Sequence, residues 1–138
     1  MTKNDKVSAV LALGGGAARG LAHIGILDVL EQNGIEIKGV AGTSIGAVVG
    51  SLYAAHKLQD FECFIRELDA KGMLKLLDPV IPRAGLFAGN RIARKLEEFL
   101  PDIEIEDLDI PFCAVSTDIT DGDEVLHTSG PVMPPIRA

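Results

Sequence analysis

Cysteine and basic charge are both scarce in this chain, and each shortage excludes a class of protein. The 138 residues include only Cys63 and Cys113, which are too few for a disulfide framework or a zinc site. We expect both to be small buried residues in a reducing compartment. The 13 basic residues are outnumbered by 20 acidic ones, which gives a net charge of −7. No nucleic-acid partner is therefore expected, because phosphate contacts require a basic surface.

Long apolar segments and metal-ligand patterns are also missing. The uncharged stretch 39–55 is short for a membrane span and contains four glycines, and no signal peptide is evident at the charged start of the chain. Three histidines are present, none spaced as in a metal site or a catalytic triad: His23, His56 and His127. We take all three as structural and expect no metal or other cofactor. The length predicts one domain, and we expect it to be cytoplasmic, with room for peripheral contact at a membrane.

The first forty residues have the pattern of a β-α-β unit. Residues 7–13 form an almost continuous apolar run, as expected of a parallel strand covered on both faces. A glycine-rich loop follows at 14–20, and residues 21–32 have the apolar periodicity of a helix that Asn-Gly at 33–34 ends. The apolar run 39–41 then predicts the second strand.

Directly after this second strand, residues 42–46 read Gly-Thr-Ser-Ile-Gly. A serine with a glycine two residues to either side, between a strand and a helix, is the pattern of a nucleophile elbow. The sharp turn makes the Ser44 hydroxyl project away from the backbone. Glycines are needed at Gly42 and Gly46 because side chains at these positions would collide with neighbouring atoms. The alternative is that Ser44 only caps the following helix. In that helix, Gly46 and Gly50 share one face, which predicts close approach of a neighbouring element.

The glycine-rich loop has three interpretations. A dinucleotide-binding fingerprint fails because Ala17 or Arg19 occupies a required glycine position, and because the second strand ends in Gly42 rather than an acid. A phosphate-binding Walker loop fails because Gly-Lys-Ser/Thr is absent. The third interpretation is an anion-binding turn, whose backbone N–H groups face a developing negative charge. A right-handed crossover would place this loop beside Ser44, at the carboxyl edge of a parallel sheet.

The loop at 14–20 followed by Leu-Ala-His-Ile-Gly, and then the serine elbow, together resemble the bacterial branch of the patatin-like phospholipases. Four shorter segments further on also match that branch: 85–87, 110–112, 116–118 and 136–138. The resemblance covers almost the whole chain and implies acyl-ester hydrolysis of lipids by a Ser–Asp dyad without histidine. The fold we predict is a three-layer α/β/α domain with a mostly parallel central sheet. Residues 1–138 would be the N-terminal portion of that single domain, with its C-terminal part absent.

The resemblance also implies roles for individual residues. Ser44 matches the nucleophile, and the amides of Gly15, Gly16 and Ala17 match the oxyanion hole, with Arg19 as the basic residue of that loop. The family usually has glycine where Ala17 stands. An alanine N–H can still donate there, but a positive φ would strain the residue.

The catalytic aspartate of the family is missing. It lies in an Asp-Gly-Gly or Asp-Gly-Ala motif, and this sequence has none. Residues 121–123, Asp-Gly-Asp, lie between two strand-like runs and predict a hairpin turn instead. In the family, the segment matching 136–138 comes shortly before the aspartate motif. We therefore expect a fragment, one half of a cleaved chain that pairs with its missing C-terminal segment, or a degenerate relative.

The function predicted from these features is serine acyl hydrolysis of phospholipid or lysophospholipid esters through an acyl-enzyme on Ser44. The lipid ester is the expected partner. The alternative from another class is a non-catalytic α/β binding or scaffolding relative that has kept the fold and lost the base. Nucleotide binding at the glycine-rich loop is a third hypothesis, which the failed fingerprints disfavour.

Overall fold

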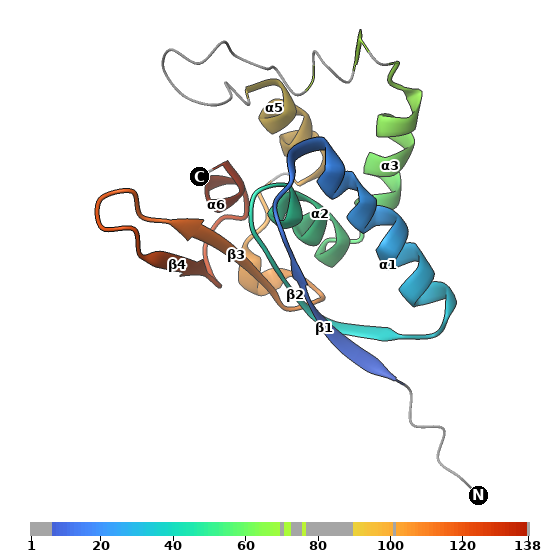
Figure 1. Cartoon of the computed structure of the whole chain (residues 1–138), viewed down its shortest axis with the longest axis horizontal. Helices are drawn as coiled ribbons and strands as arrows, with labels where there is room; N and C mark the ends of the chain where they lie inside the picture. The colour runs from blue at the N-terminus through green and yellow to red at the C-terminus, as the bar shows by residue number, and fades with distance from the viewer. Residues whose placement is uncertain (1–6, 70, 73–75, 77–89, 101, 138) are drawn as a thin grey trace, which may run out of the picture.

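The computed structural model describes residues 7–69, 71–72, 76, 90–100 and 102–137, which form a four-stranded sheet with helices packed against it (Figure 1). The strands are β1 (Ser8–Leu13), β2 (Glu36–Gly42), β3 (Phe112–Thr117) and β4 (Glu124–His127). The α-helices are α1 (Ala22–Gln32), α2 (Ile45–Ala54), α3 (Leu58–Glu67), α5 (Asn90–Phe99) and α6 (Met133–Arg137). Two 3₁₀ turns are η1 (Ala17–Leu21) and η2 (Ile105–Asp107).

The sheet has the order β1-β2-β3-β4, with the first three strands parallel and β4 antiparallel to β3. This confirms the predicted α/β class with a mostly parallel sheet. Leu13 pairs with Gly42, and Gly42 pairs with Ala114, so β1 and β2 end at the same level of the sheet. The turns that follow β1 and β2 therefore lie at one carboxyl edge, as the crossover argument predicted.

Helices α1 and α2 lie on the same face of the sheet. The crossovers β1-α1-β2 and β2-α2-β3 step in the same direction along the strand order, and right-handed connections then place both helices on one side. The core lies between these helices and the sheet, where α2 packs on β2 and β3. Val40, Phe112 and Ala114 all project into this core and are at most 5% exposed.

The expectation that the first strand is covered on both faces is wrong for the described part of the chain. Exposure alternates along β1: Leu11 and Leu13 pack into the core, whereas Val10 is 73% exposed and Ala12 is exposed too. The physical reason is that both crossover helices cover the same face. The second helical layer and the single-domain organisation of residues 1–138 stay predictions.

Helix α2 is buried on all sides. Each of its ten residues is inaccessible or nearly so, which explains why the stretch 39–55 carries no charge. The hydroxyl of Ser51 donates a hydrogen bond to the carbonyl oxygen of Val48 at 3.0 Å, and that of Tyr53 donates to the Glu31 carboxylate at 2.7 Å. No helix in the described ranges is long and apolar enough to cross a membrane.

Gly50 lets α2 approach the sheet closely. A Cβ atom at this position would lie 2.9 Å from Cγ1 of Val40 and 3.1 Å from Cε2 of Phe112. Both neighbours are themselves buried, so neither has room to move aside. The expected close approach at this glycine is therefore present.

Gly50→Leu should overpack this interface and lower the free energy of unfolding by about 1–3 kcal/mol. Gly25→Leu is the matched control, because Gly25 is an exposed position of α1 with no neighbouring atom within 4 Å of an added Cβ. Removing a helical glycine there should leave stability unchanged or raise it slightly. Thermal and denaturant unfolding of both variants measures the difference, and equal stabilities would contradict the close packing of Gly50.

Candidate active site

Ser44 lies in a strained and exposed turn between β2 and α2. Its backbone angles are φ 53° and ψ −128°, a combination that a residue with a side chain rarely adopts. Although Ser44 occupies the N-cap position of α2, its side chain makes no capping hydrogen bond. The carbonyl of Ser44 accepts hydrogen bonds from the N–H groups of Ala47 and Val48 instead. Capping of α2 therefore does not explain why a serine stands here.

The glycines on either side of Ser44 are required by close backbone contacts. A Cβ at Gly42 would collide with the carbonyl oxygen of Gly46. A Cβ at Gly46 would collide with the carbonyl oxygen of Leu13 and lie 2.8 Å from that of Gly14. The start of α2 thus packs directly on the end of β1, and both positions exclude every other residue type.

The glycine-rich loop lies beside Ser44. A Cβ at Gly15 would lie 3.5 Å from Cβ of Ser44, which is ordinary van der Waals distance. The N–H of Thr43 donates to the carbonyl of Leu13 at 3.1 Å and ties the two turns together. The predicted neighbourhood of glycine loop and serine elbow is therefore present.

The loop itself also has an unusual backbone. Gly16 has φ 148°, and Ala17 has φ 48°, in the left-handed region that favours glycine. The strain expected for alanine at this position is therefore present. The carbonyl of Gly16 accepts the N–H of Arg19 at 3.1 Å, which closes the turn into η1.

Several polar groups in this region have no partner in the described part of the chain. The N–H groups of Gly15 and Gly16 donate to no described acceptor, and the Ser44 hydroxyl makes no described hydrogen bond. All three residues are exposed, as is Arg19. Among the described residues, the site therefore presents a hydroxyl beside amide donors that no hydrogen bond occupies, which is a combination that acyl transfer can use.

Ala17→Gly should relieve the positive φ of this loop. Left-handed backbone costs an L-residue about 1–2 kcal/mol, and the added freedom of the unfolded glycine offsets about 0.4–1 kcal/mol of the gain. We expect the free energy of unfolding to stay equal or rise by up to about 1.6 kcal/mol. Ala18→Gly, at an exposed η1 position without positive φ, should instead lower stability by about 0.5–1 kcal/mol. Equal losses in the two variants, measured by thermal unfolding, would contradict the strain at Ala17.

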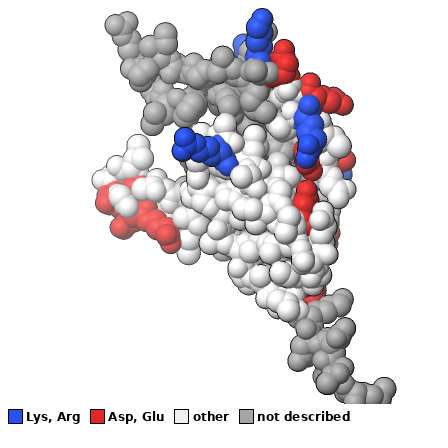
Figure 2. Space-filling model, turned by 45° about the vertical axis from the view of Figure 1, so that its right-hand side comes forward, with Lys and Arg blue, Asp and Glu red and all other residues white. Residues whose placement is uncertain are grey.

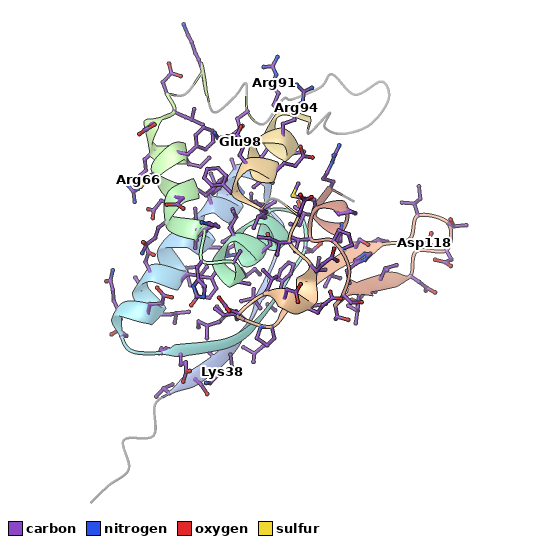
Figure 3. All side chains as sticks on the ribbon, turned by 180° about the vertical axis from the view of Figure 1, so that it is seen from behind. Lys38, Arg66, Arg91, Arg94, Glu98 and Asp118 are labelled. Carbon is purple, nitrogen blue, oxygen red and sulfur yellow. The ribbon has the colours of Figure 1, made fainter. Side chains whose placement is uncertain are left out.

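Residues 121–123 form the predicted hairpin turn and do not belong to the site. Gly122 has φ 84°, and the N–H of Asp118 donates to the carbonyl of Asp123 at 2.8 Å across the β3–β4 hairpin. Figure 3 shows Asp118 on this hairpin, and Figure 2 shows acidic side chains gathered there. The Thr120 N–H donates to the Asp118 carboxylate at 2.8 Å, which lowers the pKa of Asp118 and weakens it as a base.

The histidines have separate partners. His56 lies 3.3 Å from the carboxylate of Asp109, and the His127 ring lies 2.8 Å from the Ser116 hydroxyl. Within the ranges that the structure describes, no group of three or more His, Cys, Asp or Glu side chains could hold a metal ion. The ring of His23 contacts the glycine loop, through the carbonyl of Gly14 at 3.0 Å. Sequence reasoning missed this contact; the only signal was a histidine in the first turn of the helix after the loop.

The expectation of two buried cysteines is wrong for Cys63. Both cysteines are free; Cys63 is exposed and Cys113 is half-buried. Helix α3 buries Leu58 and Phe61. Cys63 follows Phe61 by two residues, about 200° around the helix, and so lies on the opposite face.

Comparisons with known proteins show the family to which the chain belongs. The family model described as patatin-like phospholipase matches residues 11–132, and the chain belongs to this family. The matched range contains both the glycine loop and the serine elbow. The short segment 85–87, one of those on which the resemblance rested, lies outside the described residues.

The chain is also similar to several longer proteins. It is 42% identical to an uncharacterized NTE family protein of Mycobacterium tuberculosis over 128 residues, 93% of this chain and 36% of that protein. It is 38% identical over 132 residues to human patatin-like phospholipase domain-containing protein 6, with 93% of this chain and 10% of that protein covered. Neuropathy target esterase sws of Drosophila persimilis is 37% identical over 133 residues, 93% of this chain and 9% of that protein. The chain therefore spans about a third or less of the length of these relatives.

Proposed function

We propose that this chain carries the nucleophile and the oxyanion hole of a serine hydrolase that cleaves lipid acyl esters. The observation that supports this most is the exposed, strained Ser44 beside the glycine loop. Strained backbone persists where the surrounding structure over-determines it, and it clusters at functional sites. Here two of the positive-φ residues, Ala17 and Ser44, lie in the two turns that meet at one edge of the sheet.

The proposed reaction begins with attack of Ser44 Oγ on the ester carbonyl, which forms an acyl-enzyme that water later hydrolyses. Negative charge develops on the carbonyl oxygen in each step. The amides of Gly15, Gly16 and Ala17 would donate hydrogen bonds to it, and Arg19 would add positive charge. Losing one such donor typically costs about 3 kcal/mol of transition-state stabilisation.

The base that accepts the Ser44 proton is proposed to be the family aspartate of an Asp-Gly-Gly or Asp-Gly-Ala motif, which residues 1–138 do not contain. With an ordinary pKa of about 3.9, an aspartate is a weak base at neutral pH, so burial and close contact with Ser44 would have to assist it. A segment that carries this motif is thus a proposed partner of the chain.

The lipid substrate is proposed from the family and the names of its members. The family is described as patatin-like phospholipases, and one relative is named an esterase. Phospholipid or lysophospholipid esters are the proposed substrate class. Peripheral contact with a membrane surface belongs to the same proposal, since such substrates lie in membranes.

A second candidate is a non-catalytic binding or scaffolding domain of the same family. Its support is that the two carboxylates of the β3–β4 hairpin, Asp118 and Asp121, accept hydrogen bonds from amides of their own hairpin rather than from Ser44. The two candidates differ in whether Ser44 reacts, which can be measured directly.

Ser44→Ala should abolish both fluorophosphonate labelling and p-nitrophenyl-ester hydrolysis, in an intact protein that carries the aspartate motif. Ser116→Ala is the matched control, because Ser116 is a hydroxyl hydrogen-bonded to a histidine elsewhere on the sheet. It should keep both activities. Labelling that persists in Ser44→Ala would show that Ser44 is not the nucleophile, and an intact protein that never reacts would favour the scaffolding candidate.

The 138-residue chain assayed alone should hydrolyse esters about 10²–10⁴-fold more slowly than the intact enzyme, because general-base assistance is absent. A weak residual rate from the oxyanion loop should remain. Adding a C-terminal segment with the aspartate motif in trans should restore hydrolysis. Full activity of residues 1–138 alone would instead place a base within the chain, with Asp118→Asn and Asp121→Asn as the first variants to test.

A further inference from the structure

His23 makes one specific contact with the glycine loop. It is the second residue of α1, and its Nε2 lies 3.0 Å from the carbonyl oxygen of Gly14. Because a carbonyl oxygen only accepts hydrogen bonds, the His23 ring must donate, and Nε2 must carry a proton. Both the neutral Nε2–H tautomer and the imidazolium ion satisfy this condition.

This hydrogen bond constrains the next amide in the loop. The carbonyl of Gly14 and the N–H of Gly15 belong to one peptide unit, which is planar and trans, so the two groups point in opposite directions. Holding the carbonyl toward the first turn of α1 therefore directs the Gly15 N–H away from that turn. Gly15 is the loop residue whose Cβ position lies 3.5 Å from Cβ of Ser44.

The Gly14 carbonyl also packs against the main chain of Gly46, but within the described residues the contact with His23 is the only hydrogen bond that this peptide unit makes. No neighbouring atom lies within 4 Å of the position that a Cβ of Gly14 would take, and the N–H of Gly15 has no described acceptor. Consecutive glycines can rotate the peptide between them at small steric cost. A rotated peptide would present a carbonyl oxygen, rather than an N–H group, to a developing oxyanion.

We propose that His23 is a positioning residue of the oxyanion loop, which orients the Gly15 N–H toward the substrate oxygen by holding the Gly14 carbonyl. This inference rests on the proposed hydrolase function. His23 acts through the backbone and does not itself contact the substrate or Ser44. Interactions made only with the oxyanion stabilise the transition state and leave ground-state binding unchanged. Losing the His23 hydrogen bond should therefore lower kcat and leave KM nearly unchanged.

The kinetic test compares His23→Leu with His23→Gln in the intact protein. Leucine removes the donor, whereas glutamine places an amide N–H₂ at a similar reach. His23→Leu should lower kcat by about 10–100-fold with little change in KM. This loss in kcat is no larger than the loss caused by removing a whole oxyanion donor. His23→Gln should retain most of kcat. A merely structural histidine would instead lower the melting temperature of both variants, or leave kcat unchanged in His23→Leu, and either result would overturn the proposal.

A second measurement does not depend on activity. The nitrogen NMR spectrum of labelled histidine in the 138-residue chain should show His23 protonated at Nε2, and the same signal should remain in Ser44→Ala. The Gly15 amide resonance should shift in His23→Leu and stay in place in His23→Gln. A neutral His23 with its proton on Nδ1 would overturn the proposal even if the enzyme is active. An unreactive Ser44 with the expected His23 signals would refute the hydrolase function and leave the orientation of the Gly14–Gly15 peptide established.

Discussion

The backbone contact between Gly46 and the end of β1 is the constraint on which the site depends. Gly46 lies so close to the carbonyl oxygens of Leu13 and Gly14 that no side chain fits there. Because β1 and β2 end in register, this contact brings the turn after β2 against the turn after β1. The position of Ser44 relative to the glycine loop therefore follows from packing of main chain on main chain, which is more rigid than contact through side chains.

Strain at the site is sustained by burial around it. Ser44 and Ala17 both have positive φ, and each would relax if its neighbours could move. The neighbours of Ser44 cannot move easily, because α2 begins directly after Ser44 and all ten residues of α2 are buried. At the other turn, a side chain at Gly20 would collide with Ile45, so η1 is also packed closely against the start of α2. The packing free energy of the core thus offsets the backbone strain of the two turns.

Much of the fold was predictable because its signals are local. The apolar run 7–13, the helical period of 21–32 and the Asn-Gly ending of α1 each depend on neighbouring residues, and Gly34 does take a positive φ of 71°. The hairpin at 121–123 follows from Asp-Gly for the same reason. The serine elbow was predictable because its glycine spacing reflects backbone collisions that any such turn would have.

The sequence by itself determined the α/β class, the order of the first elements, and the residue types of both turns, since each depends on local backbone preferences and apolar periodicity. Only the tertiary structure decided which face of β1 is covered, because that depends on the direction of the crossovers along the sheet. It also decided that Cys63 is exposed and that His23 reaches the Gly14 carbonyl. These outcomes arise from contacts between segments that periodicity does not relate, and they appear only when the chain is packed.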